Sequence, residues 1–201
     1  RVTAKAHSSE EADRLCQPLI DEIKGRLGGF VYGVDVDSLE QLVVNLLKEQ
    51  SKTLATAESC TGGLLSKRLT DVCGSSAVFH MGLVTYSNQA KEQLLGVPHE
   101  TLMSHGAVSE ETARAMAQGA VKTSGSSLGV GITGIAGPDG GTDEKPVGLI
   151  YIALSDGKDT WVTKRSPIGR TKSREWHRHC AASQALDMVR RYLMGLPVLE
   201  K

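Results

Sequence analysis

The stretch from residue 53 to residue 64, TLATAESCTGGL, constrains the fold of this chain more than any other. Its first half, residues 53–57, consists of small and partly β-branched residues, which favours a buried strand. A helical pattern opens at Gly62, and the glycine pair at 62 and 63 lets the backbone turn sharply. The chain is therefore expected to pass from a strand directly into a helix at this point.

Four side chains able to accept or exchange protons lie in this turn: Glu58, Ser59, Cys60 and Thr61. The free N–H groups at the start of a helix favour a negative charge, so we expect the turn to face a phosphorylated ligand. The predicted substrate contacts from this turn are Glu58, Thr61, Gly62 and Gly63. A simpler interpretation is a tight turn in which a serine or threonine caps the helix.

Strands and helices alternate along the rest of the chain. Strands are predicted over 77–86, 128–133, 147–155 and 160–165, and helices over 39–47, 88–95, 109–121 and 171–193. Residues 99–108 have no clear period and are predicted to form a loop. The Asp156-Gly157 turn joins the last two strands as a hairpin. The pattern predicts an α/β fold, a three-layer α/β/α sandwich with a mixed sheet.

The first 34 residues are predicted to form a short N-terminal α+β appendage. Residues 1–6 have the pattern of a strand, and a helix with an apolar face is expected to begin near Glu10 and to end at Gly28-Gly29. A boundary near residue 35 then separates this appendage from the main domain, which is predicted to span residues 35–197.

Composition excludes several classes of function. The chain has 40% hydrophobic and 23% charged residues, which is typical of a soluble globular protein. Its 23 basic and 23 acidic residues give no net charge, and this argues against direct nucleic-acid binding through a general basic surface. Without an apolar run of membrane-spanning length or a signal-peptide core, we expect a cytoplasmic protein with reduced cysteines.

Three predicted strand ends carry chemistry: the Ser59 turn, the Tyr86-Ser87-Asn88 segment with Lys91, and the glycine-dense loop 133–142. Ligands of open α/β sheets usually bind at the carboxyl ends of strands, so these segments are expected to meet. A serine beside a lysine is a workable nucleophile and base if partial burial keeps the lysine neutral, and a tyrosine can relay the proton. The Thr133 hydroxyl and the loop backbone suit a phosphate, a ribose or an oxyanion.

Two alternatives concern other reactive side chains. Cys60 is a rival nucleophile, because a thiol at a helix N-terminus would have a lowered pKa. His177 and Cys180 share one helix face and could hold a metal, although a structural pair is favoured without further ligands. The residues alone thus predict an α/β enzyme or binding domain for a small phosphorylated ligand, with no metal or cofactor assigned.

Four ordered motifs resemble the C-terminal domain of the CinA (competence/damage-inducible protein) family. They are residues 57–63 (AESCTGG), 86–91 (YSNQAK), 107–111 (AVSEE) and 131–142 (GITGIAGPDGGT). The resemblance spans about residues 38–196. Residues 1–34 in turn resemble the end of the KH-type segment that precedes this domain in long CinA proteins.

The resemblance implies hydrolysis of the carboxamide of nicotinamide mononucleotide (NMN) to nicotinic acid mononucleotide and ammonia, without a metal. By motif, Ser59 would be the nucleophile, and Lys91 and Tyr86 would activate it. The loop with Thr133, Gly134 and Gly137 would bind substrate or stabilise the oxyanion. Arg170 or Arg174 would contact the substrate phosphate.

Two other functions stay open at this point. The first is a nucleotide-binding or regulatory domain that keeps the fold without turnover. The second is an interaction module for DNA uptake or recombination proteins, which the family name suggests and the neutral charge disfavours. Apolar helix faces in a domain of this size also predict a homodimer or a larger homo-oligomer.

Overall fold

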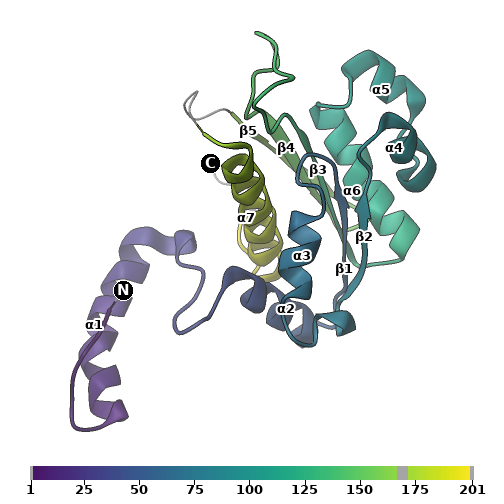
Figure 1. The fold of residues 1–201 in the computed structure, drawn as a ribbon. Helices are drawn as coiled ribbons and strands as arrows, with labels where there is room; N and C mark the ends of the chain where they lie inside the picture. Colours follow the sequence, from purple (N-terminus) through teal and green to yellow (C-terminus); the bar gives the residue numbers. More distant parts are fainter. Residues whose placement is uncertain (1, 167–171, 200–201) are drawn as a thin grey trace. The chain divides into compact units, whose positions relative to one another are not determined.

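The computed structural model describes residues 2–166 and 172–199. The chain divides between Val36 and Asp37 into two compact units, which are coloured along the sequence in Figure 1. This boundary lies within two residues of the predicted one.

Among its described residues, 2–36, the first unit has helices as its regular elements. Helix α1 (Ser9–Leu27) begins after Ser8, whose Oγ accepts a hydrogen bond from the Glu11 N–H, and a short 3-10 turn (Gly28–Phe30) follows. The strand expected over residues 1–6 is not formed by residues 2–6. A strand needs hydrogen bonds from a paired neighbour, and the described part of this unit contains none. That residues 1–34 end a KH-type segment stays a prediction.

The second unit alternates helices and strands in the expected manner. Its elements are α2 (Leu39–Glu49), β1 (Leu54–Glu58), α3 (Leu64–Thr70), a 3-10 turn (Ser75–Ala77), β2 (Phe79–Val84), α4 (Asn88–Leu95), α5 (His99–His105), α6 (Glu110–Ser124), β3 (Leu128–Gly134), β4 (Ile150–Ser155), β5 (Thr160–Arg165) and α7 (Arg174–Leu193). The sheet order is β2-β1-β3-β4-β5. Strand β1 is parallel to β2 and β3, whereas β4 is antiparallel to both of its neighbours. The mixed sheet is therefore confirmed.

Helices cover both faces of this sheet. Helices α4, α5 and α6 lie on one side, and α2, α3 and α7 lie on the other (Figure 1). The larger apolar core joins α2, α3 and α7 to the sheet and contains fully buried Leu47, Leu69 and Leu186. A second cluster, with Leu95 and Met116, lies under α4 and α6. The three-layer α/β sandwich predicted from the sequence is thus confirmed.

Four helices of this unit begin with a serine whose side chain caps the helix. The hydroxyls of Ser38, Ser87, Ser109 and Ser173 each accept a hydrogen bond from an N–H group three residues later. One helix was not expected: residues 99–105 form α5, although 99–108 were predicted to form a loop. The wrong prediction has a simple cause, since Leu102 is the only buried residue of α5 and leaves almost no apolar period.

Glycines bring α6 close to both the sheet and α4. A Cβ at Gly119 would lie 2.2 Å from the backbone oxygen of Leu95 in α4, and one at Gly131 would lie 2.5 Å from the backbone oxygen of Ala113 in α6. No side chain fits at these distances. The position of α4, which carries Lys91, therefore depends on the absence of a side chain at Gly119.

Replacing this glycine is expected to loosen the packing. Gly119→Ala should lower the free energy of unfolding by about 1–3 kcal/mol through overpacking against α4, despite the higher helix propensity of alanine. Lys122→Ala, at an exposed position of the same helix, is the matched control and should change it by less than about 0.5 kcal/mol. Urea denaturation of both variants measures the difference. Equal stability of the two variants would contradict the proposed packing constraint.

Candidate active site

The carboxyl ends of three parallel strands meet at one edge of the sheet. Glu58, the last residue of β1, is in register with Val84 of β2 and Ile132 of β3. The ladder continues one step further, because the Ser59 N–H donates to the Ile132 oxygen and the Thr85 N–H donates to the Glu58 oxygen. The turn after β1, the start of α4 and the loop after β3 are therefore neighbours, as the alternation of strands and helices predicted.

A buried lysine lies beside the predicted nucleophile. The Lys91 Nζ is 3.3 Å from the Ser59 Oγ and donates to the Thr85 oxygen at 2.9 Å. Lys91 is only 1% exposed and Ser59 only 9% exposed. Burial lowers the pKa of Lys91, and within the described residues no carboxylate forms an ion pair with it. The structure thus brings together a hydroxyl and an amine whose neutral form is favoured.

Tyr86 does not join this pair. Its side chain is 63% exposed, and its hydroxyl accepts a hydrogen bond from the Arg174 Nη2 at 3.2 Å. The Nη1 of the same guanidinium donates to the Gly137 oxygen at 2.9 Å. Arg174 thereby connects the segment after β2 with the glycine-rich loop after β3. In this state Tyr86 is not placed to relay a proton between Lys91 and Ser59.

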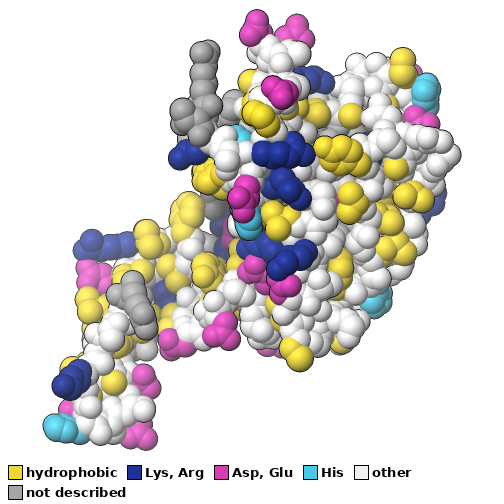
Figure 2. Space-filling view, viewed as in Figure 1, with side chains coloured by type: hydrophobic (Ala, Val, Ile, Leu, Met, Phe, Trp, Pro, Cys, Tyr) yellow, Lys and Arg dark blue, Asp and Glu magenta, His cyan; other side chains and the backbone are white. Residues whose placement is uncertain are grey.

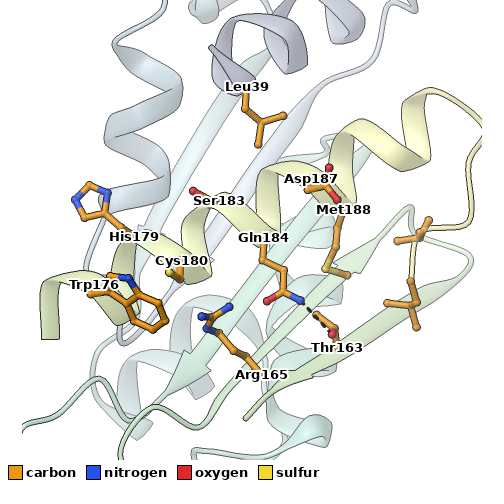
Figure 3. Close-up of a pocket in the computed structure, with 12 residues that line it drawn as sticks. Leu39, Thr163, Arg165, Trp176, His179, Cys180, Ser183, Gln184, Asp187 and Met188 are labelled. Carbon is orange, nitrogen blue, oxygen red and sulfur yellow. Dashed lines mark hydrogen bonds between the residues drawn. The ribbon is translucent and has the colours of Figure 1, made fainter. Parts of the chain in front are cut away.

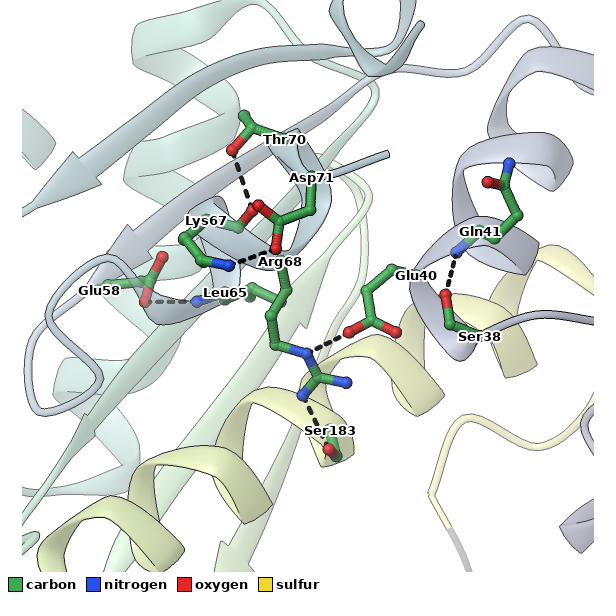
Figure 4. Close-up of polar contacts among 10 residues, drawn as sticks. All are labelled: Ser38, Glu40, Gln41, Glu58, Leu65, Lys67, Arg68, Thr70, Asp71 and Ser183. Atoms are coloured by element: carbon green, nitrogen blue, oxygen red, sulfur yellow. Dashed lines mark hydrogen bonds and ion pairs between the residues drawn. The ribbon is translucent and has the colours of Figure 1, made fainter. Parts of the chain in front are cut away.

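The start of α3 is already occupied by a side chain of the protein. The Glu58 carboxylate accepts hydrogen bonds from the N–H groups of Gly63, Leu65 and Ser66 (Figure 4 shows the bond to Leu65). Glu58 is completely buried. The expectation that these N–H groups face a phosphorylated ligand is therefore wrong, and so is the predicted substrate contact by Glu58. The carboxylate of a residue near in sequence already accepts the hydrogen bonds of the first N–H groups of the helix.

The two glycines of the turn serve its shape. Gly62 and Gly63 have φ values of 59° and 90°, a region that glycine adopts most easily. Their N–H groups donate to the Ser59 oxygen and to the Glu58 carboxylate, respectively. They are thus not available as the substrate donors that we expected. The prediction of a sharp strand-to-helix turn is confirmed.

Two backbone donors next to Ser59 remain open. Within the described part of the chain, the N–H groups of Cys60 and Thr61 have no backbone acceptor. The Thr61 Oγ1 is also buried and has no hydrogen-bond partner there. These groups lie beside the nucleophile and are candidates to bind an oxyanion.

The loop after β3 is held by its own contacts. The Thr133 hydroxyl donates to the Ala107 oxygen at 2.6 Å, so its proton already has an acceptor. A Cβ at Gly134 would lie 2.6 Å from the Leu149 oxygen, and the Gly137 oxygen accepts from Arg174. In the described structure, these residues shape the edge of the site. The predicted substrate contacts of Thr133, Gly134 and Gly137 stay predictions.

Sequence reasoning missed Arg178. Its Nε donates to the Thr61 oxygen at 3.0 Å, and its Nη2 donates to the same oxygen. The two residues are 117 positions apart, so only folding reveals the contact. Basic side chains gather over α3 and α7 in Figure 2. The one sequence signal for Arg178 was the basic start of the last predicted helix, from which Arg174 was selected instead. The other predicted phosphate contact, Arg170, lies outside the described residues.

The alternative nucleophile and the alternative metal pair find no support in the geometry. Burial raises the pKa of Cys60 to about 12, the reverse of the predicted lowering. His177 is 2% exposed, and its Nδ1 has no partner among the described residues. Residues 2–166 and 172–199 contain no group of three or more His, Cys, Asp or Glu side chains that could hold a metal ion. Nor does any helix in these ranges have the length and apolarity to cross a membrane.

A separate groove of about 810 Å³ runs along α7 and β5. Figure 3 shows Trp176, Arg165 and Gln184 lining it, with the Gln184 Nε2 3.4 Å from the Thr163 Oγ1. Neither Ser59 nor Lys91 lines this groove. A smaller hollow of about 420 Å³, lined by Leu64, Arg174, Glu175, Arg178 and His179, lies closer to the nucleophile turn.

Comparison with known proteins agrees with these motifs. Residues 36–193 match the family described as the CinA C-terminal domain. The chain is also 55% identical over 198 residues to the CinA-like protein of Desulfovibrio desulfuricans. The chain belongs to the CinA family. The aligned part covers 98% of this chain and 47% of that relative, so this CinA chain spans about half the length of the curated relatives it matches.

Solved structures of the CinA family share the fold. The competence/damage inducible protein CihA from Agrobacterium tumefaciens has a TM-score of 0.74 and 39% sequence identity, covering 82% of this chain and 98% of its own. A CinA superfamily protein from Klebsiella pneumoniae also has a TM-score of 0.74, with 32% identity, covering 78% of this chain and 96% of its own. The α/β sandwich described above is thus the fold of these relatives.

The burial of Cys60 predicts its reactivity. In the folded protein at pH 8, iodoacetamide should modify the exposed Cys73 and leave Cys60 unmodified, because Cys60 is buried and its pKa is raised. Peptide mass spectrometry locates the modified cysteines. In urea, Cys60 should react as well, which controls for intrinsic reactivity. Rapid modification of Cys60 in the folded state would restore it as a rival nucleophile.

Proposed function

We propose that this CinA domain is an amidohydrolase that converts NMN to nicotinic acid mononucleotide and ammonia, with Ser59 as the nucleophile. The observation that carries the proposal is the buried pair of Ser59 and Lys91. A lysine without a carboxylate partner costs folding free energy when it is buried, so its place beside a hydroxyl fits a chemical role better than a structural one.

The pair supports acyl transfer through a covalent intermediate. Neutral Lys91 accepts the Ser59 proton while the Oγ attacks the carboxamide carbon, and the carbonyl electrons move to its oxygen. The open N–H groups of Cys60 and Thr61 are the candidate donors to this oxyanion. When the C–N bond breaks, protonated Lys91 returns the proton to the leaving nitrogen and ammonia forms. Lys91 then deprotonates a water molecule, whose oxygen attacks the acyl carbon. When the C–Oγ bond breaks, Lys91 returns this proton to the Ser59 Oγ and nicotinic acid mononucleotide is released.

A second group supports an anionic substrate. Among the residues that the structure describes, the Arg174 guanidinium is bound only to uncharged oxygens, those of Tyr86 and Gly137. A phosphate would bind it more strongly, because both partners would then be charged. In this proposal Arg174 exchanges these oxygens for the substrate phosphate, and Tyr86 contacts the bound nucleotide. The choice of NMN within the class of phosphorylated carboxamides rests on the family resemblance.

Ammonia release from NMN tests the proposal. The wild-type protein should release ammonia and nicotinic acid mononucleotide, and Ser59→Ala should lower kcat by at least about a thousandfold. Cys60→Ala is the matched control at the adjacent buried position and should keep most of the activity. Coupled ammonia detection with chromatography of the nucleotides measures both.

The other outcomes separate the alternatives. Loss of activity in Cys60→Ala alone would indicate a thiol amidase. A folded wild-type protein that binds NMN without product would indicate the nucleotide-binding domain without turnover.

The lowered pKa of Lys91 also predicts a pH dependence. Only the neutral amine accepts a proton, so kcat/KM should rise with pH through the Lys91 pKa, with the midpoint of the rise below the ordinary lysine value of 10.5. Below that pKa the ammonium form predominates and activity should fall tenfold per pH unit. Lys91→Arg, which stays protonated, should be inactive throughout. A flat profile between pH 6 and 10 would contradict the role of Lys91 as the base.

A further inference from the structure

Glu58 has an unusual place beside the nucleophile. It directly precedes Ser59, it is completely buried, and within the described residues it forms no ion pair. Four hydrogen bonds reach its carboxylate instead. They come from the N–H groups of Gly63 (3.1 Å), Leu65 (3.0 Å) and Ser66 (2.8 Å) and from the Ser66 hydroxyl (2.6 Å). The proposed reaction uses none of these contacts directly.

The carboxylate replaces the missing cap of α3. The N-cap residue of this helix is Gly63, which has no side chain to satisfy the first N–H groups. Glu58 reaches them from the end of β1 and places its negative charge at the positive end of the helix dipole. The Ser66 hydroxyl, itself 2.7 Å from the Thr56 Oγ1, ties the same carboxylate back to β1.

This arrangement closes a ring around the nucleophile. The backbone of Glu58 is held in the sheet between β2 and β3, while its side chain is bound eight residues later at Ser66. Ser59 lies inside that closed segment. From the outside, Arg178 binds the Thr61 oxygen of the same segment. The direction of the Ser59 side chain toward Lys91 is therefore set by contacts at both ends of the turn.

We propose that Glu58 is a positioning residue for Ser59: its buried carboxylate binds the first turn of α3 and so holds the nucleophile within reach of Lys91 and beside the open N–H groups. The inference rests on the proposed function for its kinetic consequence. The Nζ–Oγ distance of 3.3 Å is already near the upper limit for proton transfer between the two atoms. A displacement of about 1 Å in a reacting group can lower the rate about a hundredfold.

Glu58→Gln tests the inference at nearly constant size. The amide presents an NH₂ group where the carboxylate accepts, so at least one N–H of α3 loses its acceptor. We expect kcat for NMN hydrolysis to fall by about a hundredfold, with KM changed less than about threefold, because the substrate site itself is intact. An increase in KM with unchanged kcat would overturn the inference, since it would show that Glu58 contacts the substrate.

Ser66→Ala provides a graded variant that keeps the carboxylate and three of its four bonds. It should lower kcat by about three- to tenfold, as expected for one hydrogen bond. Thr70→Ala is the matched control and should leave kcat unchanged. Within the described residues, this exposed hydroxyl at the end of α3 bonds only to the Ser66 and Lys67 oxygens (Figure 4 shows Thr70 and Lys67). If Glu58→Gln does not fold, an unchanged kcat in Ser66→Ala overturns the inference.

Labelling of Ser59 with a fluorophosphonate separates this inference from the proposed reaction. The probe reports how reactive the serine is, whatever the substrate. Slower labelling in Glu58→Gln and, less so, in Ser66→Ala supports positioning even if NMN is not hydrolysed, in which case the proposed function alone fails. Equal labelling rates in wild type and Glu58→Gln overturn the inference. A folded wild type that neither hydrolyses NMN nor reacts with the probe overturns both.

Discussion

Burial of the Lys91 amine against Ser59 is the constraint on which the site depends. An amine removed from water favours its neutral form, and that form is the one able to take a proton from a hydroxyl. The Thr85 oxygen accepts a hydrogen bond from this amine and so fixes the orientation of the nitrogen beside Ser59. The burial in turn requires α4 to lie close against α6, which the missing side chain at Gly119 permits. Packing far from the reacting atoms thus decides the chemistry of one nitrogen.

Most polar backbone groups of the nucleophile turn are hydrogen-bonded within the protein itself. Glu58 takes up the N–H groups at the start of α3, and Arg178 takes up the Thr61 oxygen. Among the described residues, the N–H donors of Cys60 and Thr61, directly beside Ser59, have no backbone acceptor. Donors that are already bound shape the turn, and unbound donors are available to a substrate. Groups that support the turn and groups open to a substrate thus lie within nine consecutive residues, 58–66.

Local patterns predicted most of the fold and part of the site. Alternation of strands and helices was enough for the layers. The predicted starts of the helices at 39, 88 and 109 lie within one residue of the observed ones, where serine side chains cap them locally. Ser59 and Lys91 were selected from their positions at strand ends, and parallel strands must end at the same edge. The α5 helix was missed, because one buried residue gives no period.

The sequence by itself determined the strand-to-helix turn and the alternation of strands and helices, since both follow from short-range patterns. It also placed Ser59 and Lys91 at strand ends, but their contact across 32 residues required the sheet to form. Tertiary structure alone decided the partners of Glu58, Tyr86 and Arg178. From the local sequence, a carboxylate at the end of a strand can face either a ligand or a helix start, and only the packed position of α3 selects the second. Likewise, Tyr86 bonds to Arg174 and Arg178 bonds to Thr61 across 88 and 117 residues. Contacts at such separations leave no local pattern, because they arise only when the layers close.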